Sequence, residues 1–276
     1  YKNAAHIFDE VEKKTPYLEY PLFQETGIVT SAFSTRLGGV SEGYYSSLNL
    51  SFDRGDDPAR VLENFKRIGA SMGVAVEDMV LSKQTHTTNV RVVTKEDKGK
   101  GVMRECNYTD VDGMITNVPG ICLVTSYADC VPLYFVDPVK KVIGLSHSGW
   151  RGTVGKIGKV TVEKMEEEFG CDPADILGAV GPSICQDCYE VSEDVIKKFR
   201  ENYDENLWPE IFYQKENGKY QLNLWKANES VFLESGILPE HIAVTNVCTH
   251  CNPDILFSHR TTGNERGTLS AFLALK

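Results

Sequence analysis

The sequence contains no hydrophobic run that approaches the roughly 20 apolar residues of a membrane-spanning helix. Its first residues are acidic and polar, and they lack the basic and then apolar order of a secretory signal peptide. The sequence begins at Tyr1 rather than at a methionine, which leaves open the removal of a leader. These absences argue against a helical membrane protein, and we expect a protein of the cytoplasm that binds no membrane.

Basic residues are scarce. The sequence has 29 Lys and Arg residues against 39 Asp and Glu residues, for a formal net charge of -10, and the basic residues are scattered along the chain. Proteins that bind nucleic acid gather Lys and Arg on one surface. The sequence therefore argues against a nucleic-acid partner, and an anionic substrate would need a local cationic pocket.

Low-complexity tracts, internal repeats and long Pro, Gly or Ser linkers are also absent. Hydrophobic residues make up 41% of the sequence and charged residues 25%, close to the averages of globular proteins. We therefore expect residues 1–276 to form a single domain. The oligomeric state cannot be read from these features.

The eight cysteines include two C-x-x-C pairs, Cys185 with Cys188 and Cys248 with Cys251. Without a secretion signal, thiols in a chain of this length are more often buried, catalytic or metal-bound than joined in disulfides. The two pairs could supply a four-thiolate zinc site, but familiar zinc ribbons keep such pairs much closer in sequence. We therefore favour reduced thiols. The remaining cysteines outside the metal-site candidates carry no motif: Cys106, Cys122 and Cys171.

Short apolar runs rich in β-forming residues alternate with helical patterns along the chain. The predicted strands are residues 27–34, 79–81, 89–94, 121–127, 131–136, 142–146, 176–180 and 242–247. The predicted helices are a segment capped by Asp57 and Pro58, residues 149–169 ended by Gly170, and residues 193–202 and 224–235. Residues 95–109 read as an exposed connection. This alternation predicts an α+β fold, a layered sandwich of β-sheets covered by α-helices.

Three potential metal ligands fall at the ends or edges of predicted strands: His86, Cys130 and His147. One thiolate and two imidazoles suit Zn²⁺, and three protein ligands leave a fourth tetrahedral position open, as in catalytic zinc sites. Such a metal lowers the pKa of a bound water molecule and so makes a nucleophile available. The sequence therefore predicts a zinc enzyme, although isolated His and Cys residues are often structural.

Several motifs occur in an order that characterises one family: FSTRLGGVS at 33–41, QTH at 84–86, DG at 112–113, ADCVPL at 128–133, HSGWRG at 147–152, GPSI at 181–184 and CT at 248–249. Together they resemble the laccase-domain proteins, whose members are named multicopper polyphenol oxidases, peptidoglycan editing factors and purine nucleoside phosphorylases. The resemblance spans most of the chain. The sequence departs from the usual family pattern around residues 185–188 and 264–267, and we assign no site residue there.

The resemblance implies one domain of sheets between helices, with zinc held by His86, Cys130 and His147. It also implies phosphorolysis of adenosine, inosine, guanosine or methylthioadenosine to the base and (deoxy)ribose 1-phosphate, together with deamination of adenosine. Polyphenol oxidation needs several copper centres with many His ligands. The chain has six histidines, of which only His86 and His147 lie in ligand motifs, so copper oxidase activity is disfavoured and zinc is preferred over copper.

Phosphorolysis requires a cationic group for phosphate, and Arg36 in its Gly-rich loop is the first candidate. Hydroxyl groups nearby could add donors: Ser34, Thr35 and Ser41. Arg151 is the second candidate for the phosphate. Either arginine could equally be a surface or ion-paired residue.

Asp129, beside Cys130, is the candidate for proton transfer in deamination, or else a turn residue. Gln84 either orients the substrate or satisfies neighbouring backbone groups. Asp112 is expected to close a turn near the site rather than to perform chemistry. His259 and Arg260 could border the pocket, and the sequence does not decide their role.

Another class of enzyme uses the same residues differently. Cys130 and His147 could form a nucleophile and base pair, which would make the protein a thiol hydrolase acting on amides of cell-wall precursors. Such an enzyme would be free of zinc and sensitive to iodoacetamide. A non-catalytic partner protein is a third reading, but an open three-ligand site is hard to explain for a scaffold.

Overall fold

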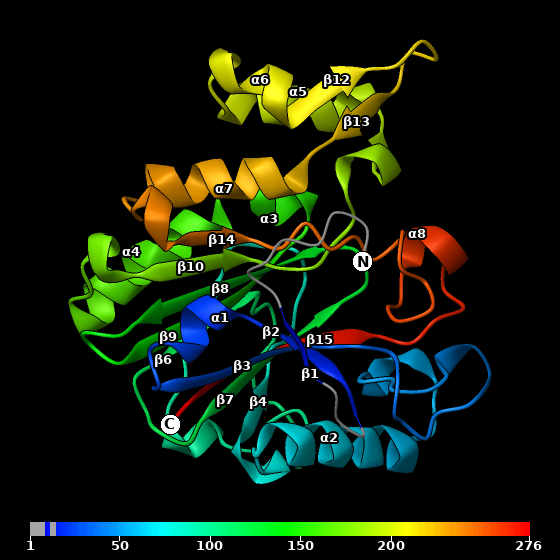
Figure 1. Cartoon of the computed structure of the whole chain (residues 1–276), viewed down its shortest axis with the longest axis vertical. Helices are drawn as coiled ribbons and strands as arrows, with labels where there is room; N and C mark the ends of the chain where they lie inside the picture. The colour runs from blue at the N-terminus through cyan, green and yellow to red at the C-terminus, as the bar shows by residue number, and fades with distance from the viewer. Residues whose placement is uncertain (1–8, 12–14) are drawn as a thin grey trace.

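Two six-stranded sheets lie face to face at the centre of the computed structural model, which describes residues 9–11 and 15–276 (Figure 1). The first sheet has the strand order β1 (Asp9–Val11), β2 (Tyr17–Glu19), β3 (Val29–Ser34), β15 (Leu269–Leu275), β7 (Cys122–Tyr127) and β4 (Met79–Leu81). The second has the order β14 (Ile242–Val244), β10 (Leu177–Val180), β8 (Val131–Asp137), β9 (Val142–Ser148), β6 (Gly113–Thr116) and β5 (Val90–Val92). Side chains from both sheets form one buried core, including Leu123 and Leu273 from the first and Tyr134 and Leu145 from the second.

Helix α2 (Pro58–Met72) covers the outer face of the first sheet (Figure 1). Asp57 caps it by accepting a hydrogen bond from the backbone N–H of Ala59 at 2.9 Å, and the helix ends at Gly73, whose φ of 72° is left-handed. The predicted apolar residues at helical spacing, among them Phe65, are buried against the sheet. The helix expected after Asp57 is therefore confirmed.

Helices α4 (Ile157–Phe169) and α7 (Leu224–Glu234) cover the outer face of the second sheet. Phe135 of β8 and Phe232 of α7 pack with ring centroids 5.0 Å apart. The prediction of a single helix over residues 149–169 is wrong in one respect. The segment is divided into two helices, α3 (Trp150–Val154) and α4. Lys156 adopts a left-handed φ of 55° between them, which an α-helix cannot contain.

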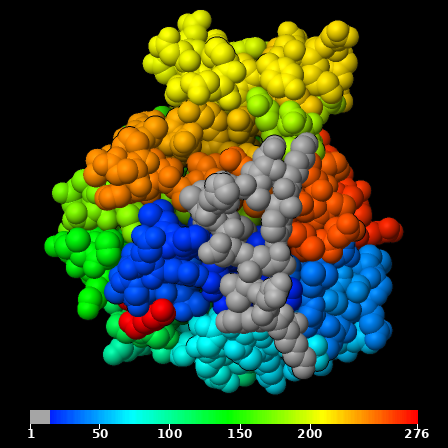
Figure 2. Space-filling model, in the orientation of Figure 1, coloured from blue at the N-terminus to red at the C-terminus, as the bar shows by residue number. Residues whose placement is uncertain are grey.

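A third, three-stranded sheet lies beyond α7 with the order β11 (Glu190–Val191), β13 (Tyr220–Leu222) and β12 (Phe212–Gln214). With α5 (Glu193–Asn202) and α6 (Trp208–Ile211) it forms a lobe at one end of the molecule, drawn in yellow in Figure 2. The Tyr203 hydroxyl ties this lobe to the rest by donating to the carbonyl oxygen of Thr153 in α3 at 2.7 Å. Two short helices complete the fold: α1 (Pro21–Gln24) and α8 (His259–Thr262).

The α+β class and the sandwich of sheets covered by helices are confirmed. Several strands were not expected from the sequence, including β6 and β15, the latter fully buried between β3 and β7. The expectation that residues 95–109 form an exposed connection is wrong in part, because the Asp97 and Lys100 side chains are buried there and paired at 2.7 Å. No helix in the described part of the chain is long and apolar enough to cross a membrane.

Candidate metal centre

His86, Cys130 and His147 come together at one edge of the two sheets, with one donor atom of each lying within 4.8 Å of the others. Sγ of Cys130 lies 4.0 Å from Nε2 of His86. The two imidazole rings are nearly perpendicular, at 83°, with centroids 4.9 Å apart. The structure therefore assembles the three predicted ligands around one point.

The connections between the two sheets bring these residues together. His86 lies in the crossover from β4 of the first sheet to β5 of the second, and Cys130 lies in the crossover from β7 to β8. Because β4 and β7 are neighbouring parallel strands, both crossovers leave the first sheet at the same edge. His147 lies within β9, which runs two residues further than the predicted strand.

The Asp112 carboxylate, fully buried, organises two of the ligands. Oδ1 accepts from the backbone N–H of His86 at 3.0 Å and lies 2.8 Å from Nδ1 of His147. Oδ2 accepts from the backbone N–H groups of Thr85 at 2.9 Å and Thr87 at 3.1 Å. Burial by itself would raise the pKa of Asp112, but the hydrogen bonds from His147 and these N–H groups lower it to about 2. The carboxylate is thus ionised. It holds the loop around His86, and His86 itself has a left-handed φ of 66°.

The side chains of His86, Cys130 and His147 suit a metal ion such as zinc. A ligating imidazole usually donates its second N–H to a carboxylate, and Asp112 fills that role for His147. Gly149 leaves the centre open, because a Cβ there would lie 2.9 Å from Cδ2 of His86 and 3.1 Å from Sγ of Cys130. One thiolate and two imidazole nitrogens are ligands that Zn²⁺ favours.

The electrostatics of the pair Cys130 and His147 favour their charged forms without a metal. Burial opposes ionisation of the Cys130 thiol, but the facing His147, and then His86, lower its pKa. Burial likewise opposes protonation of His147, but the Cys130 thiolate and Asp112 raise its pKa. Cys130 is therefore poised as a thiolate, the form that binds metals and attacks electrophiles.

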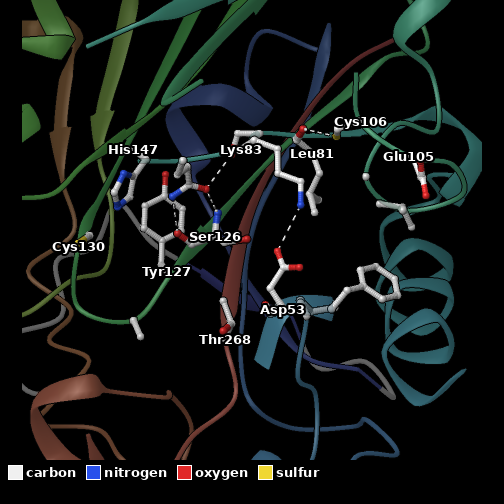
Figure 3. A pocket seen from close by; sticks show the side chains of 18 of the residues that line it. Asp53, Leu81, Lys83, Glu105, Cys106, Ser126, Tyr127, Cys130, His147 and Thr268 are labelled. Atoms are coloured by element: carbon white, nitrogen blue, oxygen red, sulfur yellow. Dashed lines mark hydrogen bonds and ion pairs between the residues drawn. The ribbon is translucent and has the colours of Figure 1, made fainter. Parts of the chain in front are cut away.

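Two cavities meet at this centre, and His86, Ala128 and Cys130 line both. The larger has a volume of about 700 Å³, and Figure 3 shows His147 and Cys130 at one end and Glu105 at the other. The smaller, of about 160 Å³, has a basic lining that includes Arg151 and Arg260. The centre therefore faces space for two different molecules.

Gln84 and Ser34 are held by backbone groups. Oε1 of Gln84 accepts from the Ser126 backbone N–H at 2.7 Å, and Nε2 donates to the Ser126 carbonyl at 2.9 Å, although Gln84 also lines the larger cavity. Oγ of the buried Ser34 accepts from the backbone N–H of Ser270 at 2.9 Å, and Ser34 lines neither cavity at the centre.

Arg36 lies in a different cavity from the three ligands. Its guanidinium donates to the carbonyl oxygens of Ser46 at 2.9 and 3.1 Å and of Pro253 at 2.8 Å, and it stacks over the ring of Phe257. Burial lowers its pKa, while Asp254 opposes that change. These contacts use most of the donors that a phosphate would need.

Asp129 and Arg151 both line the smaller cavity. The Asp129 carboxylate accepts from the hydroxyl of Thr249 and from the backbone N–H of Arg260, each at 2.6 Å. The guanidinium of Arg151 is exposed and lies 4.3 Å from the centroid of the Trp150 ring. Of these two residues, Arg151 has the side chain more available to a ligand.

Three basic residues of the larger cavity were not foreseen from the sequence: Lys83, Arg104 and Arg266. Lys83 pairs with Asp53 at 3.3 Å (Figure 3). Nε of Arg266 is buried and has no hydrogen-bond partner among the described residues, and burial, followed by the neighbouring Arg54, lowers its pKa to about 10. These residues sit in irregular segments, so no periodic pattern marked them.

The comparisons with known proteins cover nearly the whole chain. The family model of the multi-copper polyphenol oxidoreductase laccases matches residues 30–276. A purine nucleoside phosphorylase, YlmD of Bacillus subtilis (strain 168), is 36% identical over 251 residues, which are 90% of this chain and 89% of that protein. Adenosine deaminase RL5 of an unknown prokaryotic organism is 35% identical over 238 residues, 86% of this chain and 90% of that protein.

A solved structure is similar in fold over the same length. The crystal structure of the Bacillus licheniformis hypothetical protein YfiH superimposes with a TM-score of 0.93 at 32% identity, and the match covers 99% of this chain and 100% of that one. The likeness therefore includes both sheets and the outer lobe.

Proposed function

This chain belongs to the multi-copper polyphenol oxidoreductase laccase family, and we propose that it is a zinc-dependent enzyme acting on purine nucleosides. The reactions assigned to it are phosphorolysis of adenosine, inosine, guanosine or methylthioadenosine and deamination of adenosine. The observation that carries the proposal is the three-ligand centre of His86, Cys130 and His147 between two cavities. The names of the relatives support both reactions.

In the proposed enzyme, His86, Cys130 and His147 hold the metal, and the chain acts as one catalytic domain because these ligands depend on both sheets. When bound, zinc supplies Lewis acidity at a position that the protein leaves open, and copper could occupy the same ligands. Asp112 keeps the proton of His147 on Nδ1. That arrangement leaves the lone pair of Nε2 directed away from Asp112, as metal binding requires.

The larger cavity is assigned to the nucleoside. Its volume of about 700 Å³ falls within the range of small-molecule sites. Its lining combines apolar side chains such as Leu81 and Val102 with polar groups such as Ser82 and Thr268, which suits a flat base joined to a hydroxylated sugar. Closeness to the centre would place the reacting atoms of the nucleoside beside the ligands.

The smaller cavity is assigned to phosphate. Its volume of about 160 Å³ lies below the range of about 300–1,000 Å³ that is usual for small-molecule sites. Arg151 and Arg260 lend it positive charge. The Arg151 guanidinium can offer a bidentate fork to a phosphate because it is exposed and makes no hydrogen bond among the described residues. Arg36, in contrast, already donates to two carbonyl oxygens, which supports a structural role.

In phosphorolysis, a phosphate oxygen forms a bond to C1′ of the ribose while the bond from C1′ to N9 of the purine breaks. The purine leaves with the bonding electrons and takes up a proton, and the sugar leaves as the 1-phosphate. Because both cavities are lined by His86 and Cys130, phosphate in the smaller one and the nucleoside in the larger one would meet at the centre. Asp129 serves this geometry by holding the first residues of α8, including Arg260, at the wall of the smaller cavity.

Product analysis tests the proposal directly. Purified protein of known zinc content is incubated with adenosine, with and without phosphate, and adenine, inosine and hypoxanthine are separated by chromatography. We expect phosphate-dependent release of adenine, and formation of inosine without phosphate, both lost in His86→Ala and Cys130→Ala. Zinc-loaded protein that turns over no purine nucleoside would refute the proposal.

A thiol hydrolase remains the second candidate, because the lowered pKa of Cys130 and the raised pKa of His147 also suit a nucleophile and base pair. In that enzyme Cys130 would attack the carbonyl carbon of an amide in a cell-wall precursor. The amine would then leave with a proton from His147, and water would break the resulting thioester to release the acid and restore Cys130. Activity on such amides that survives chelation but not iodoacetamide would favour this function over the first.

A further inference from the structure

The two C-x-x-C pairs, which the sequence separates widely, lie at one place in the structure. Strands β10 and β14 are parallel neighbours in the second sheet, and each is followed within a few residues by one pair (Figure 1). The pairing continues past the strands, because the backbone N–H of Thr249 donates to the carbonyl of Ser183 at 3.1 Å and Ser183 is bridged to Cys248. The carboxyl ends of adjacent parallel strands thus bring both pairs to the same edge.

The four sulfur atoms have the spacing of a tetrahedral site for one ion. All four Sγ atoms lie within 4.8 Å of one another. Sγ of Cys251 lies 4.0 Å from that of Cys185 and 3.5 Å from that of Cys188. Zn–S bonds of about 2.3 Å in a regular tetrahedron place the sulfur atoms about 3.8 Å apart. The distances between the sulfur atoms therefore match one zinc ion, with too little room for a cluster of several metals.

Backbone donors point at the most buried sulfur. Sγ of Cys248 accepts from the backbone N–H of Cys185 at 3.3 Å and from that of Cys251 at 3.4 Å. A neutral thiol is a weak acceptor, whereas a thiolate gains from each such donor. These two N–H groups would offset part of the negative charge that four thiolates bring to a metal ion.

We infer that Cys185, Cys188, Cys248 and Cys251 bind a second zinc ion, distinct from the ion at His86, Cys130 and His147. Four protein ligands complete a tetrahedral shell and leave no position for water or substrate, so this ion is structural. The expectation of separate reduced thiols rested on the sequence gap between the pairs. The parallel pairing of β10 with β14 removes that objection.

The second ion would stabilise one wall of the smaller cavity. Thr249, which follows Cys248, donates its hydroxyl to Asp129 at 2.6 Å, and Asp129 precedes the ligand Cys130. Tyr189, which follows Cys188, lines the same cavity, and its ring centroid lies 5.3 Å from the guanidinium carbon of Arg260. The two loops joined by the four thiolates therefore contact the candidate active site from one side. The inference does not depend on which reaction that site performs.

The zinc content of the purified chain tests the inference. Elemental analysis of the purified chain is expected to find about two zinc ions per chain, one for each site. Cys188→Ser and Cys251→Ser should each retain about one ion, as should the reference variant Cys130→Ser, which removes a ligand of the other centre. Cys171→Ser, which alters a buried thiol outside both sites, should retain both. A wild-type chain with one zinc ion that Cys130→Ser abolishes would overturn the inference.

A second measurement, which leaves the four proposed ligands intact, covers the case in which Cys188→Ser and Cys251→Ser do not fold. Metal-free Cys130→Ser protein has lost the thiolate of the first centre, so cobalt titrated into it can form sulfur-to-cobalt charge-transfer bands only at other thiolates. We expect intense bands that saturate at one cobalt ion in the four-cysteine site, together with protection of four thiols from iodoacetamide. Absence of these bands, with the four cysteines either freely alkylated or joined as disulfides by intact mass, would overturn the inference.

Discussion

Nδ1 of His147 lies 2.8 Å from Oδ1 of Asp112, and this contact determines which nitrogen of the imidazole faces the metal centre. The ionised carboxylate can only accept, so the proton must reside on Nδ1. The same carboxylate accepts from three successive backbone N–H groups of the His86 loop. One buried side chain therefore sets the positions of two ligands on different segments.

Asp112→Asn should weaken zinc binding about 10- to 100-fold, the usual effect of losing a carboxylate partner of a ligating histidine. An amide also presents an NH₂ group to N–H donors that require an acceptor. Competition with a chromophoric chelator measures the affinity. Asp110→Asn is the matched control, because Asp110 is exposed and its side chain accepts hydrogen bonds from the hydroxyl groups of this loop rather than from its backbone, among the described residues. Equal affinities of the two variants would contradict the role given to Asp112.

Arg151→Ala should raise the KM for phosphate about 10- to 100-fold, the effect expected from losing a charge-assisted bidentate contact. The KM for adenosine should change little, because the nucleoside is assigned to the other cavity. Steady-state kinetics with each substrate varied in turn separate the two effects. Arg36→Ala should leave the phosphate KM nearly unchanged while lowering the melting temperature. If Arg36→Ala raised the KM for phosphate and Arg151→Ala did not, the phosphate site would lie at the loop around Arg36 instead.

Gly149→Ala should disturb the metal centre while the fold survives. Its φ of -71° is normal for alanine, so the backbone is not strained. The new Cβ would lie 2.9 Å from the His86 ring and 3.1 Å from Sγ of Cys130, so at least one of these two ligands would have to shift. We expect activity to fall about a hundredfold, as misplacements near 1 Å can cause. Without metal, Gly149→Ala and wild type should have the same melting temperature. A much lower melting temperature of the variant would show that the substitution acts on folding instead.

The free energy of unfolding should fall at acid pH because Asp97 becomes protonated. Burial would raise its pKa, but hydrogen bonds from Lys100, the Thr94 backbone and Arg91 lower it from 3.8 to about 2. Because the pKa is lower in the folded state, the stabilisation of about 2 kcal/mol is present above pH 4 and is lost as the pH falls toward 2. Denaturant unfolding of Asp97→Asn at pH 7 should show a loss of about this size. Glu216→Gln, an exposed charge change, should show almost none.

We also expect the free energies of unfolding of wild type and Asp97→Asn to differ less at pH 4 than at pH 7. The side chain begins to protonate in the unfolded chain first, which reduces the advantage of the folded state. A difference that stays constant down to pH 3 would mean that Asp97 stabilises the protein by packing rather than by its charge.

Local patterns in the sequence predicted many elements of the fold correctly. Helix α2 was marked by its Asp57 cap and by apolar residues at helical spacing, and β7, β8 and β9 were marked by short apolar runs. Such signals are local, since capping and periodicity involve neighbouring residues. The break at Lys156 was missed because a left-handed lysine carries no sequence signal.

The composition of the metal centre was readable from residue type and motif order, whereas its supporting shell was not. Asp112 was expected only to close a turn, and Arg266 was not considered, because their importance depends on which segments the fold places against them. The same holds for the role of Arg36, since one of its carbonyl partners, Pro253, lies on a distant segment of the chain.

The amino-acid sequence by itself determined the α+β class, the chemistry of the three ligands and the positions of most strands and helices, because these depend on side-chain type and on near neighbours. Only the tertiary structure decided the order of the strands, the two cavities and the meeting of the four cysteines. Strand pairing joins residues far apart in the chain, and the parallel pairing of β10 with β14 brings Cys185 and Cys251 within 4.0 Å across 66 positions of sequence.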